Sequence, residues 1–167
     1  RSLEDVRGII GAGAEKVVIS AAAAENPDFI RQASDSFGAS TVVVCMDVKK
    51  TPAGETRVWT RNGGQCSSYR PEEFAKLMEE KGAGEIVVQS IERDGMMNGY
   101  DIELIRNISK AVSIPVIGLG GAGSLEHMKE AYTEGHASAL AAGSLFVFQG
   151  SKRGVLINYP ERSEISF

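Results

Sequence analysis

The feature that most constrains the fold is a regular alternation of short apolar runs with longer amphipathic segments. Apolar runs rich in β-branched residues occur at 16–20, 41–48, 85–90 and 115–119, and a weaker run of small residues occurs at 137–142. The segments between them repeat their apolar positions at helical spacing. Strands that alternate with helices of this length form βαβ units, in which the strands run parallel. The order therefore predicts an α/β fold built on a parallel sheet.

A short internal repeat sharpens this prediction. The tripeptide Gly-Ala-Gly occurs at 11–13 and again at 82–84, and residues 135–137 form a weaker third copy. Each copy ends a predicted helix and leads into a predicted strand. Such quasi-equivalent units are typical of a (β/α)8 barrel. Residues 56–60, around Trp59, are expected to add a hairpin arm, and residues 154–167 a final strand or short helix.

Composition and charge exclude several function classes. The 167 residues are 43% hydrophobic and 24% charged, which is ordinary for a globular domain. The net charge of −4 provides no basic field for nucleic acid, and no apolar run reaches the length of a membrane span. The cysteines, Cys45 and Cys66, have no metal-binding or redox spacing. We expect a cytoplasmic protein without a metal ion or other cofactor.

A glycine-rich turn at 118–123 is the sharpest local motif. It reads Gly-Leu-Gly-Gly-Ala-Gly and lies between a predicted strand and a predicted helix, where backbone N–H groups can approach an anion. A dinucleotide site would need an acidic residue about 20 positions later, but residues 135–160 contain no Asp or Glu. Close packing of strand against helix is the alternative explanation of these glycines.

The next predicted strand also ends in a turn, Gly143-Ser144. In (β/α) barrels a phosphate commonly binds between the loops that follow strands seven and eight. We therefore predict a phosphate site formed by Gly120, Gly121, Gly143 and Ser144.

Two carboxylates are placed to take part in chemistry. Asp47 ends an apolar strand, where a charge is costly unless it is used or paired, and it could act as a general acid or base. Its alternative role is to cap a loop or pair with Lys49 or Lys50. Asp94 follows the next strand in an Asp-Gly sequence, which is also a common turn.

Lys16 and Glu85 each begin a strand after a Gly-Ala turn. This position predicts that both lie at the amino-terminal mouth of a barrel, where charged residues usually serve stability. We expect a rim ion pair. His127 is predicted to lie on the solvated face of a helix.

Taken together, these motifs resemble the cyclase subunits of imidazole glycerol phosphate synthases. The resemblance covers nearly the whole chain, in order, and rests on the runs at 44–49, 82–86, 90–95, 98–101 and 114–127. It implies a TIM barrel that pairs with a glutaminase subunit, which supplies ammonia through the barrel axis. The ammonia reacts with a bis-phosphorylated ribulosyl substrate, to give imidazole glycerol phosphate and an aminoimidazole carboxamide ribotide.

The resemblance also implies residue roles. Asp47 matches the general acid or base, and Asp94 with Gly95 matches a substrate-binding loop. Lys16 and Glu85 match members of a charged ring that gates ammonia entry. The same comparison assigns the phosphate site to the four residues named above.

The resemblance places the start of the chain at the third helix of the barrel. We therefore expect a single domain over residues 1–167 that forms about two-thirds of a barrel, from helix 3 to strand 8. The N-terminal third, with a second catalytic aspartate, is then expected to be missing, and the five predicted strands cannot close an eight-stranded barrel.

Several positions depart from the cyclase pattern. Ser20 and Ala21 stand where Asn-Thr is usual, Gln89 and Met96 each replace a Thr, and Leu119 replaces a Ser. Because of these departures, a second function stays possible: that of a paralogous synthase that amidates a sugar-nucleotide precursor of surface polysaccharide. A non-catalytic phosphate-binding half-barrel and a sister isomerase are further alternatives.

Overall fold

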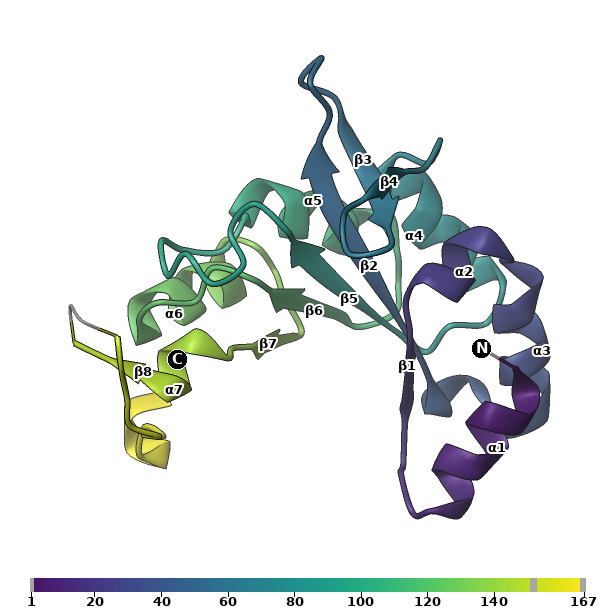
Figure 1. Cartoon of the computed structure of the whole chain (residues 1–167), viewed down its shortest axis with the longest axis horizontal. Helices are drawn as coiled ribbons and strands as arrows, with labels where there is room; N and C mark the ends of the chain where they lie inside the picture. Colours follow the sequence, from purple (N-terminus) through teal and green to yellow (C-terminus); the bar gives the residue numbers. More distant parts are fainter. Residues whose placement is uncertain (1, 151–152, 166–167) are drawn as a thin grey trace.

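A curved sheet organises the chain, for which a computed structural model describes residues 2–150 and 153–165. Its strands are β1 (Val17–Ile19), β2 (Val42–Lys50), β3 (Thr56–Thr60), β4 (Gln65–Cys66), β5 (Glu85–Ser90), β6 (Val116–Leu119) and β7 (Ala139–Ala141). The order β1-β2-β5-β6-β7 is parallel throughout. The sheet arches without closing, and β1 and β7 form the ends of the arch (Figure 1). This confirms the predicted partial barrel.

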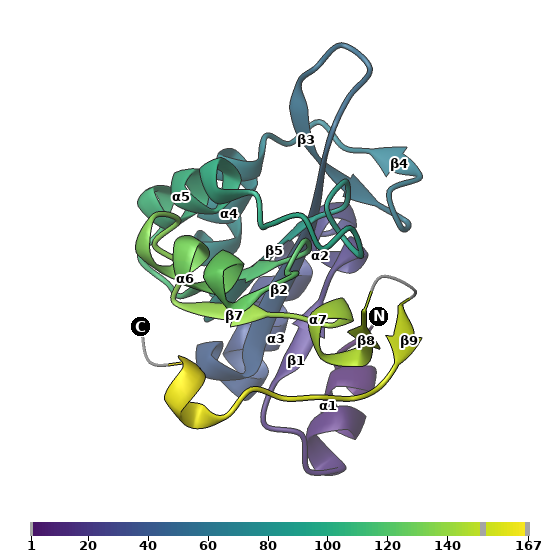
Figure 2. The ribbon, with the colours of Figure 1, turned by 90° about the vertical axis from the view of Figure 1, so that its left-hand side faces the viewer.

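Helices cover the outside of the arch (Figures 1 and 2). They are α1 (Leu3–Gly11), α3 (Asp28–Phe37), α4 (Pro71–Glu80), α5 (Ile102–Ala111) and α6 (Leu125–Thr133). The short helices α2 (Ala21–Glu25) and α7 (Ser144–Val147) follow β1 and β7, and there are two 3-10 turns, η1 (Ala39–Thr41) and η2 (Arg162–Ile165). Side chains cap several of them: Asp101 accepts from Leu104 N–H at the start of α5. The sequence did not predict α2 as a helix separate from α3.

The two faces of the sheet differ in what they contact. Along β2, the alternate residues Val42, Val44, Met46 and Val48 are buried and pack in the main core under the helices. The residues between them point to the opposite face, which we call the inner face of the arch. The period-2 pattern of the strand therefore sends one set of side chains to the core and leaves the other set for the site.

An antiparallel arm of β3 and β4 extends the sheet from the carboxyl-terminal part of β2, whose amino-terminal part pairs with β1. β3 pairs with the last residues of β2, so that Asp47 lies opposite Trp59. The indole Nε1 of Trp59 donates to the Lys49 carbonyl at 2.9 Å, and the Lys49 ammonium lies 5.1 Å from the centre of the Trp59 ring. The predicted hairpin at 56–60 is thus confirmed.

The C-terminal segment folds back as a small hairpin. β8 (Phe148–Gln149) pairs antiparallel with β9 (Gly154–Val155). The N–H of Leu156 donates to Val147 O at 3.0 Å, which ties the hairpin to α7. The segment predicted to form a final strand or short helix therefore contains both: the two-residue strand β9 and the 3-10 turn η2. Residues 166–167 lie outside the described residues.

No helix in the described ranges is long and apolar enough to cross a membrane.

Candidate functional site

The carboxyl ends of four parallel strands place one row of side chains on the inner face. The pairing register sets Asp47 beside Gln89, Gln89 beside Leu119, and Leu119 beside Ala141. Because parallel strands end at the same edge of a sheet, the loops that follow them meet above this row.

Asp47 is the ionisable member of the row. Burial raises the pKa of its carboxyl, and the nearby negative charge of Asp94 raises that pKa further. Gln89 Nε2 donates to Asp94 Oδ2 at 3.2 Å, so the amide lies between the two strand ends. Within the described part of the chain, Asp47 forms no ion pair with Lys49 or Lys50. A carboxyl with a raised pKa is suited to hold and release a proton.

Three loops beside this row enclose a small pocket, which we call the glycine pocket. It is lined by Asp94, Gly95, Leu119, Gly120, Gly121, Ala122, Ala141, Ala142, Gly143 and Ser144. The structure therefore brings together all six residues predicted to bind substrate or phosphate. The backbone of Gly120 and Gly121 is left-handed, with φ of 93° and 102°.

Close packing also requires glycine at position 121. A Cβ atom there would collide with the carbonyl oxygen of Gly99 on the neighbouring loop. The N–H of Gly99 in turn donates to Gly121 O at 2.8 Å. The packing explanation of the glycine motif and the pocket explanation are therefore both supported by the geometry.

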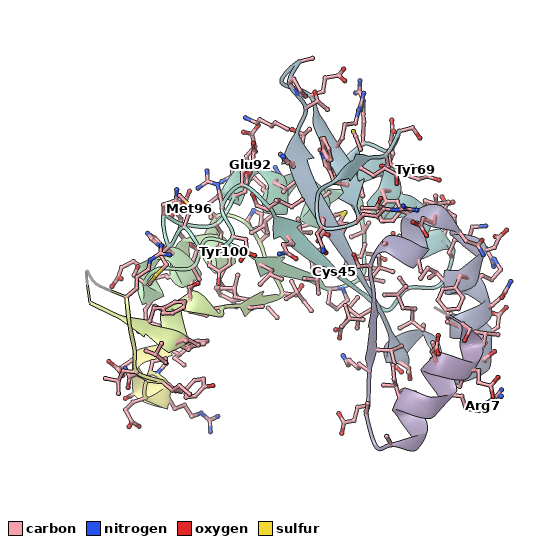
Figure 3. All side chains as sticks on the ribbon, in the orientation of Figure 1. Arg7, Cys45, Tyr69, Glu92, Met96 and Tyr100 are labelled. Atoms are coloured by element: carbon pink, nitrogen blue, oxygen red, sulfur yellow. The ribbon has the colours of Figure 1, made fainter. Side chains whose placement is uncertain are left out.

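The loop that follows β5 is tied to its neighbours by side chains (Figure 3). The hydroxyl of Tyr100 donates to Ala141 O at 3.0 Å, and Arg93 Nη1 donates to Gly99 O at 3.2 Å. Burial raises the pKa of Tyr100 to about 12, so its hydroxyl keeps the donating proton at neutral pH. The Tyr100 bond ties this loop to the end of β7, and the Arg93 bond joins two parts of the loop itself.

His127 contradicts its predicted place on a solvated helix face. It is half-buried, and its Nδ1 accepts the Gly123 N–H at 3.2 Å. Its own N–H donates to the Ser124 hydroxyl, which caps α6. Helical spacing could not reveal this role, because the ring bonds to the loop that precedes the helix. His127 thus secures the end of the glycine-rich turn.

At the opposite, amino-terminal end of the strands, Lys16 Nζ and Glu85 Oε1 form an ion pair. Glu85 lies beside Val43 in the sheet, and Lys16 precedes β1. The predicted ion pair is confirmed. Its exposure, 45% for the Lys16 side chain, limits its value to stability.

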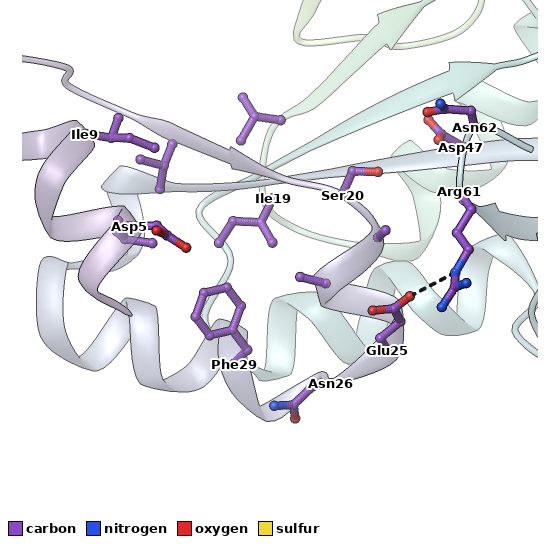
Figure 4. Close-up of a pocket in the computed structure, with 15 residues that line it drawn as sticks. Asp5, Ile9, Ile19, Ser20, Glu25, Asn26, Phe29, Asp47, Arg61 and Asn62 are labelled. Carbon is purple, nitrogen blue, oxygen red and sulfur yellow. Dashed lines mark ion pairs between the residues drawn. The ribbon is translucent and has the colours of Figure 1, made fainter. Parts of the chain in front are cut away.

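A second, larger hollow of about 860 Å³ runs along β1. Its lining includes Asp47, Ser20, Asn62 and Arg61, and Arg61 lies 3.6 Å from the Glu25 carboxylate (Figure 4). The sequence analysis missed Arg61 and Asn62, whose backbones are left-handed, with φ of 53° and 56°. The signal that could have pointed to them is the polar, glycine-containing turn at 61–64.

No group of three His, Cys, Asp or Glu side chains in the described ranges gathers as metal ligands. Cys45 is half-buried on the inner face, where burial raises its pKa to about 12. It is therefore a thiol rather than a thiolate at neutral pH.

Comparison with protein families agrees with this geometry. The family model described as "Histidine biosynthesis protein" matches residues 1–151. The matched range includes the strands of the arch, both carboxylates and every residue of the glycine pocket. The chain therefore belongs to the histidine biosynthesis protein family, a family of histidine-pathway enzymes.

Proposed function

We propose that this chain is the cyclase-type synthase part of a glutamine amidotransferase, which uses ammonia to form imidazole glycerol phosphate in histidine biosynthesis. The observation that carries the proposal is the common placement of Asp47 and the glycine pocket at one end of the sheet. A catalytic carboxyl and an anion-binding pocket at the carboxyl ends of barrel strands are a typical active-site arrangement.

Asp47 is the proposed general acid and base. A carboxyl with a raised pKa keeps a proton over a wider pH range, and it can return that proton to a leaving group after accepting it from the attacking nitrogen. The negative charge of Asp94 helps to raise the pKa of Asp47, and Gln89 donates a hydrogen bond to the Asp94 carboxylate.

The glycine pocket is the proposed phosphate site. Backbone N–H groups of the turns at 120–121 and 143–144 bind phosphate oxygens without the bulk of side chains. The Ser144 hydroxyl adds a donor on the side chain. Binding at this pocket would anchor one end of the substrate beside Asp47.

The inner face between the two ends supports the ammonia part of the proposal. Between the Lys16–Glu85 pair and Asp47, the row of Cys45, Val87 and Ile117 offers no charged group. Neutral ammonia can pass such a surface, whereas ammonium is held back by its hydration. We propose that the ion pair gates entry and that a glutaminase subunit binds over the amino ends of the strands.

A second candidate function is favoured by two of the departures from the cyclase pattern. Leu119 lines the glycine pocket where the pattern has Ser, and Gln89 bonds to Asp94 where the pattern has Thr. Both changes alter the polar contacts at the strand ends, which suits a different substrate. This candidate is a paralogous synthase that amidates a sugar-nucleotide precursor of surface polysaccharide.

The test is an ammonia-dependent assay of the full-length protein. The enzyme, in ammonium salts at alkaline pH, is given either the phosphorylated histidine-pathway intermediate or a sugar-nucleotide acceptor, and products are followed by mass spectrometry. Imidazole glycerol phosphate, formed by the wild type and lost in Asp47→Asn, supports the main proposal. An amidated sugar supports the second candidate. Phosphate binding without turnover, or isomerisation without ammonia, would contradict both.

A further inference from the structure

The glycine pocket is short of positive charge. Asp94 is the one charged side chain among the described residues that line it, and it is acidic. A phosphate monoester carries nearly two negative charges at neutral pH. A carboxylate beside it repels it, and backbone N–H groups carry only partial charges. The described lining residues therefore offer a phosphate group hydrogen-bond donors but no full positive charge.

A cationic side chain from a different part of the chain contacts one residue of this pocket. The Nη2 atom of Arg153 donates to the carbonyl oxygen of Gly95 at 2.9 Å. Gly95 is itself a lining residue of the pocket. The two residues are 58 positions apart in the sequence, so the contact depends on the folded arrangement of the C-terminal segment.

The position of Arg153 is set by the backbone of the C-terminal hairpin. The residue lies in the hairpin between β8 and β9 with φ of 50°, a left-handed conformation that side-chain-bearing residues rarely adopt. Such strain persists where the surrounding structure enforces it, and it is common in ligand-binding loops. The hairpin bonds to α7 through Leu156 and Val147, and α7 begins at the pocket residue Ser144.

We propose that Arg153 is a specificity residue of the glycine pocket and binds the phosphate group of the substrate directly. This inference rests on the proposed function, which supplies a phosphorylated substrate. A guanidinium has five N–H donors in a planar fork, and the bond to Gly95 uses one at Nη2. The others can form paired bonds to phosphate oxygens, which selects a phosphate over an uncharged or singly charged end.

The test measures phosphate binding at this pocket directly. The full-length protein is labelled with ¹⁵N and titrated with inorganic phosphate, and the amide resonances of Gly120 and Gly143 report occupancy of the pocket. Arg153→Gln is expected to raise the dissociation constant for phosphate about tenfold, because a hydrogen bond between charged groups is lost. Arg153→Lys keeps the charge without the fork and should show a smaller loss. Arg162→Gln, an exposed arginine of η2, is the matched control and should bind as the wild type does.

Steady-state kinetics give a second readout. Because Arg153 contacts the anchored end of the substrate rather than the reacting atoms, Arg153→Gln should raise KM and leave kcat unchanged. Equal phosphate affinity in the wild type and in Arg153→Gln would overturn this inference and leave the proposed function standing. No response of Gly120 and Gly143 in the wild type would overturn the proposed phosphate site itself, and this inference with it.

Discussion

Asp94 lies near enough to Asp47 for its charge to raise the pKa of the Asp47 carboxyl, which burial already raises. Asp47 lies in β2 and Asp94 in the loop that follows the neighbouring strand β5. Gln89 links them because it is paired with Asp47 in the sheet and bonded to Asp94. This relationship couples the proton affinity of the proposed acid to the loop that forms one wall of the glycine pocket.

The coupling predicts that Asp94→Asn lowers the pKa of Asp47, because the neutral amide removes the like charge but leaves the burial. A ¹³C NMR titration of the Asp47 carboxyl would measure the shift. The matched control is Glu92→Gln, which removes an exposed carboxylate from the same loop. An Asp47 pKa that stays the same in Asp94→Asn would show that burial alone sets it.

The raised pKa of Asp47 also predicts how the stability of the fold depends on pH. The folded-state pKa of this carboxyl is above 3.8, the ordinary value of an aspartate, so the native state binds more protons than the unfolded state at pH values just above 3.8. The contribution of this group to stability is therefore greatest below that pH and falls as the pH rises through its folded pKa. Asp47→Asn should be more stable than the wild type at neutral pH, and the difference should shrink in acid.

Urea unfolding at a series of pH values would measure this effect. Because the group is only half-buried, we expect the gain to be small. A loss of stability in Asp47→Asn at neutral pH would contradict the account of its environment. Together with lost turnover, a gain would indicate a residue kept for chemistry at some cost to folding.

Alanine substitutions at Gly121 and Gly95 are expected to lower the free energy of unfolding by different amounts. Both glycines have left-handed backbones, with φ of 102° and 73°, but only at Gly121 would a Cβ collide with a neighbouring carbonyl, that of Gly99. Gly95→Ala meets open space and should cost about 1 kcal/mol of the free energy of unfolding, from backbone strain alone. Gly121→Ala should cost about 3 kcal/mol, because strain and collision add. Equal losses in chemical denaturation would show that the turn relaxes.

The sequence was sufficient to predict the architecture and the glycine pocket, because both follow from local patterns. The residues of the pocket come directly after strands of a parallel sheet, so correct strand ends bring Asp94, Gly120 and Gly143 together. The hairpin around Trp59 was also marked by a run of strand-forming residues between polar turns.

The parts that were missed depend on contacts between distant segments. His127 was placed on the wrong face because its ring bonds backward to Gly123, which helical periodicity does not encode. Arg153 reaches Gly95 because the C-terminal hairpin packs against α7, an arrangement that depends on contacts far apart in the sequence. The helix α2 is five residues long and rich in alanine, so it has little amphipathic pattern to detect.

The last prediction concerns the Lys16–Glu85 pair. It distinguishes a pair that controls ammonia entry from one that only contributes to stability. The Lys16 side chain is 45% exposed, and exposed pairs contribute only about 0.2–1 kcal/mol. Lys16→Met should therefore change the free energy of unfolding by less than about 1 kcal/mol. If the pair controls ammonia entry, the same variant should lower turnover with glutamine and the glutaminase subunit much more than turnover with free ammonium salts. Lys81→Met is the matched control, because Lys81 forms a similar ion pair with Asp28 on the helical side, at 2.5 Å. Equal effects of Lys16→Met on both nitrogen sources would assign the pair a structural role alone.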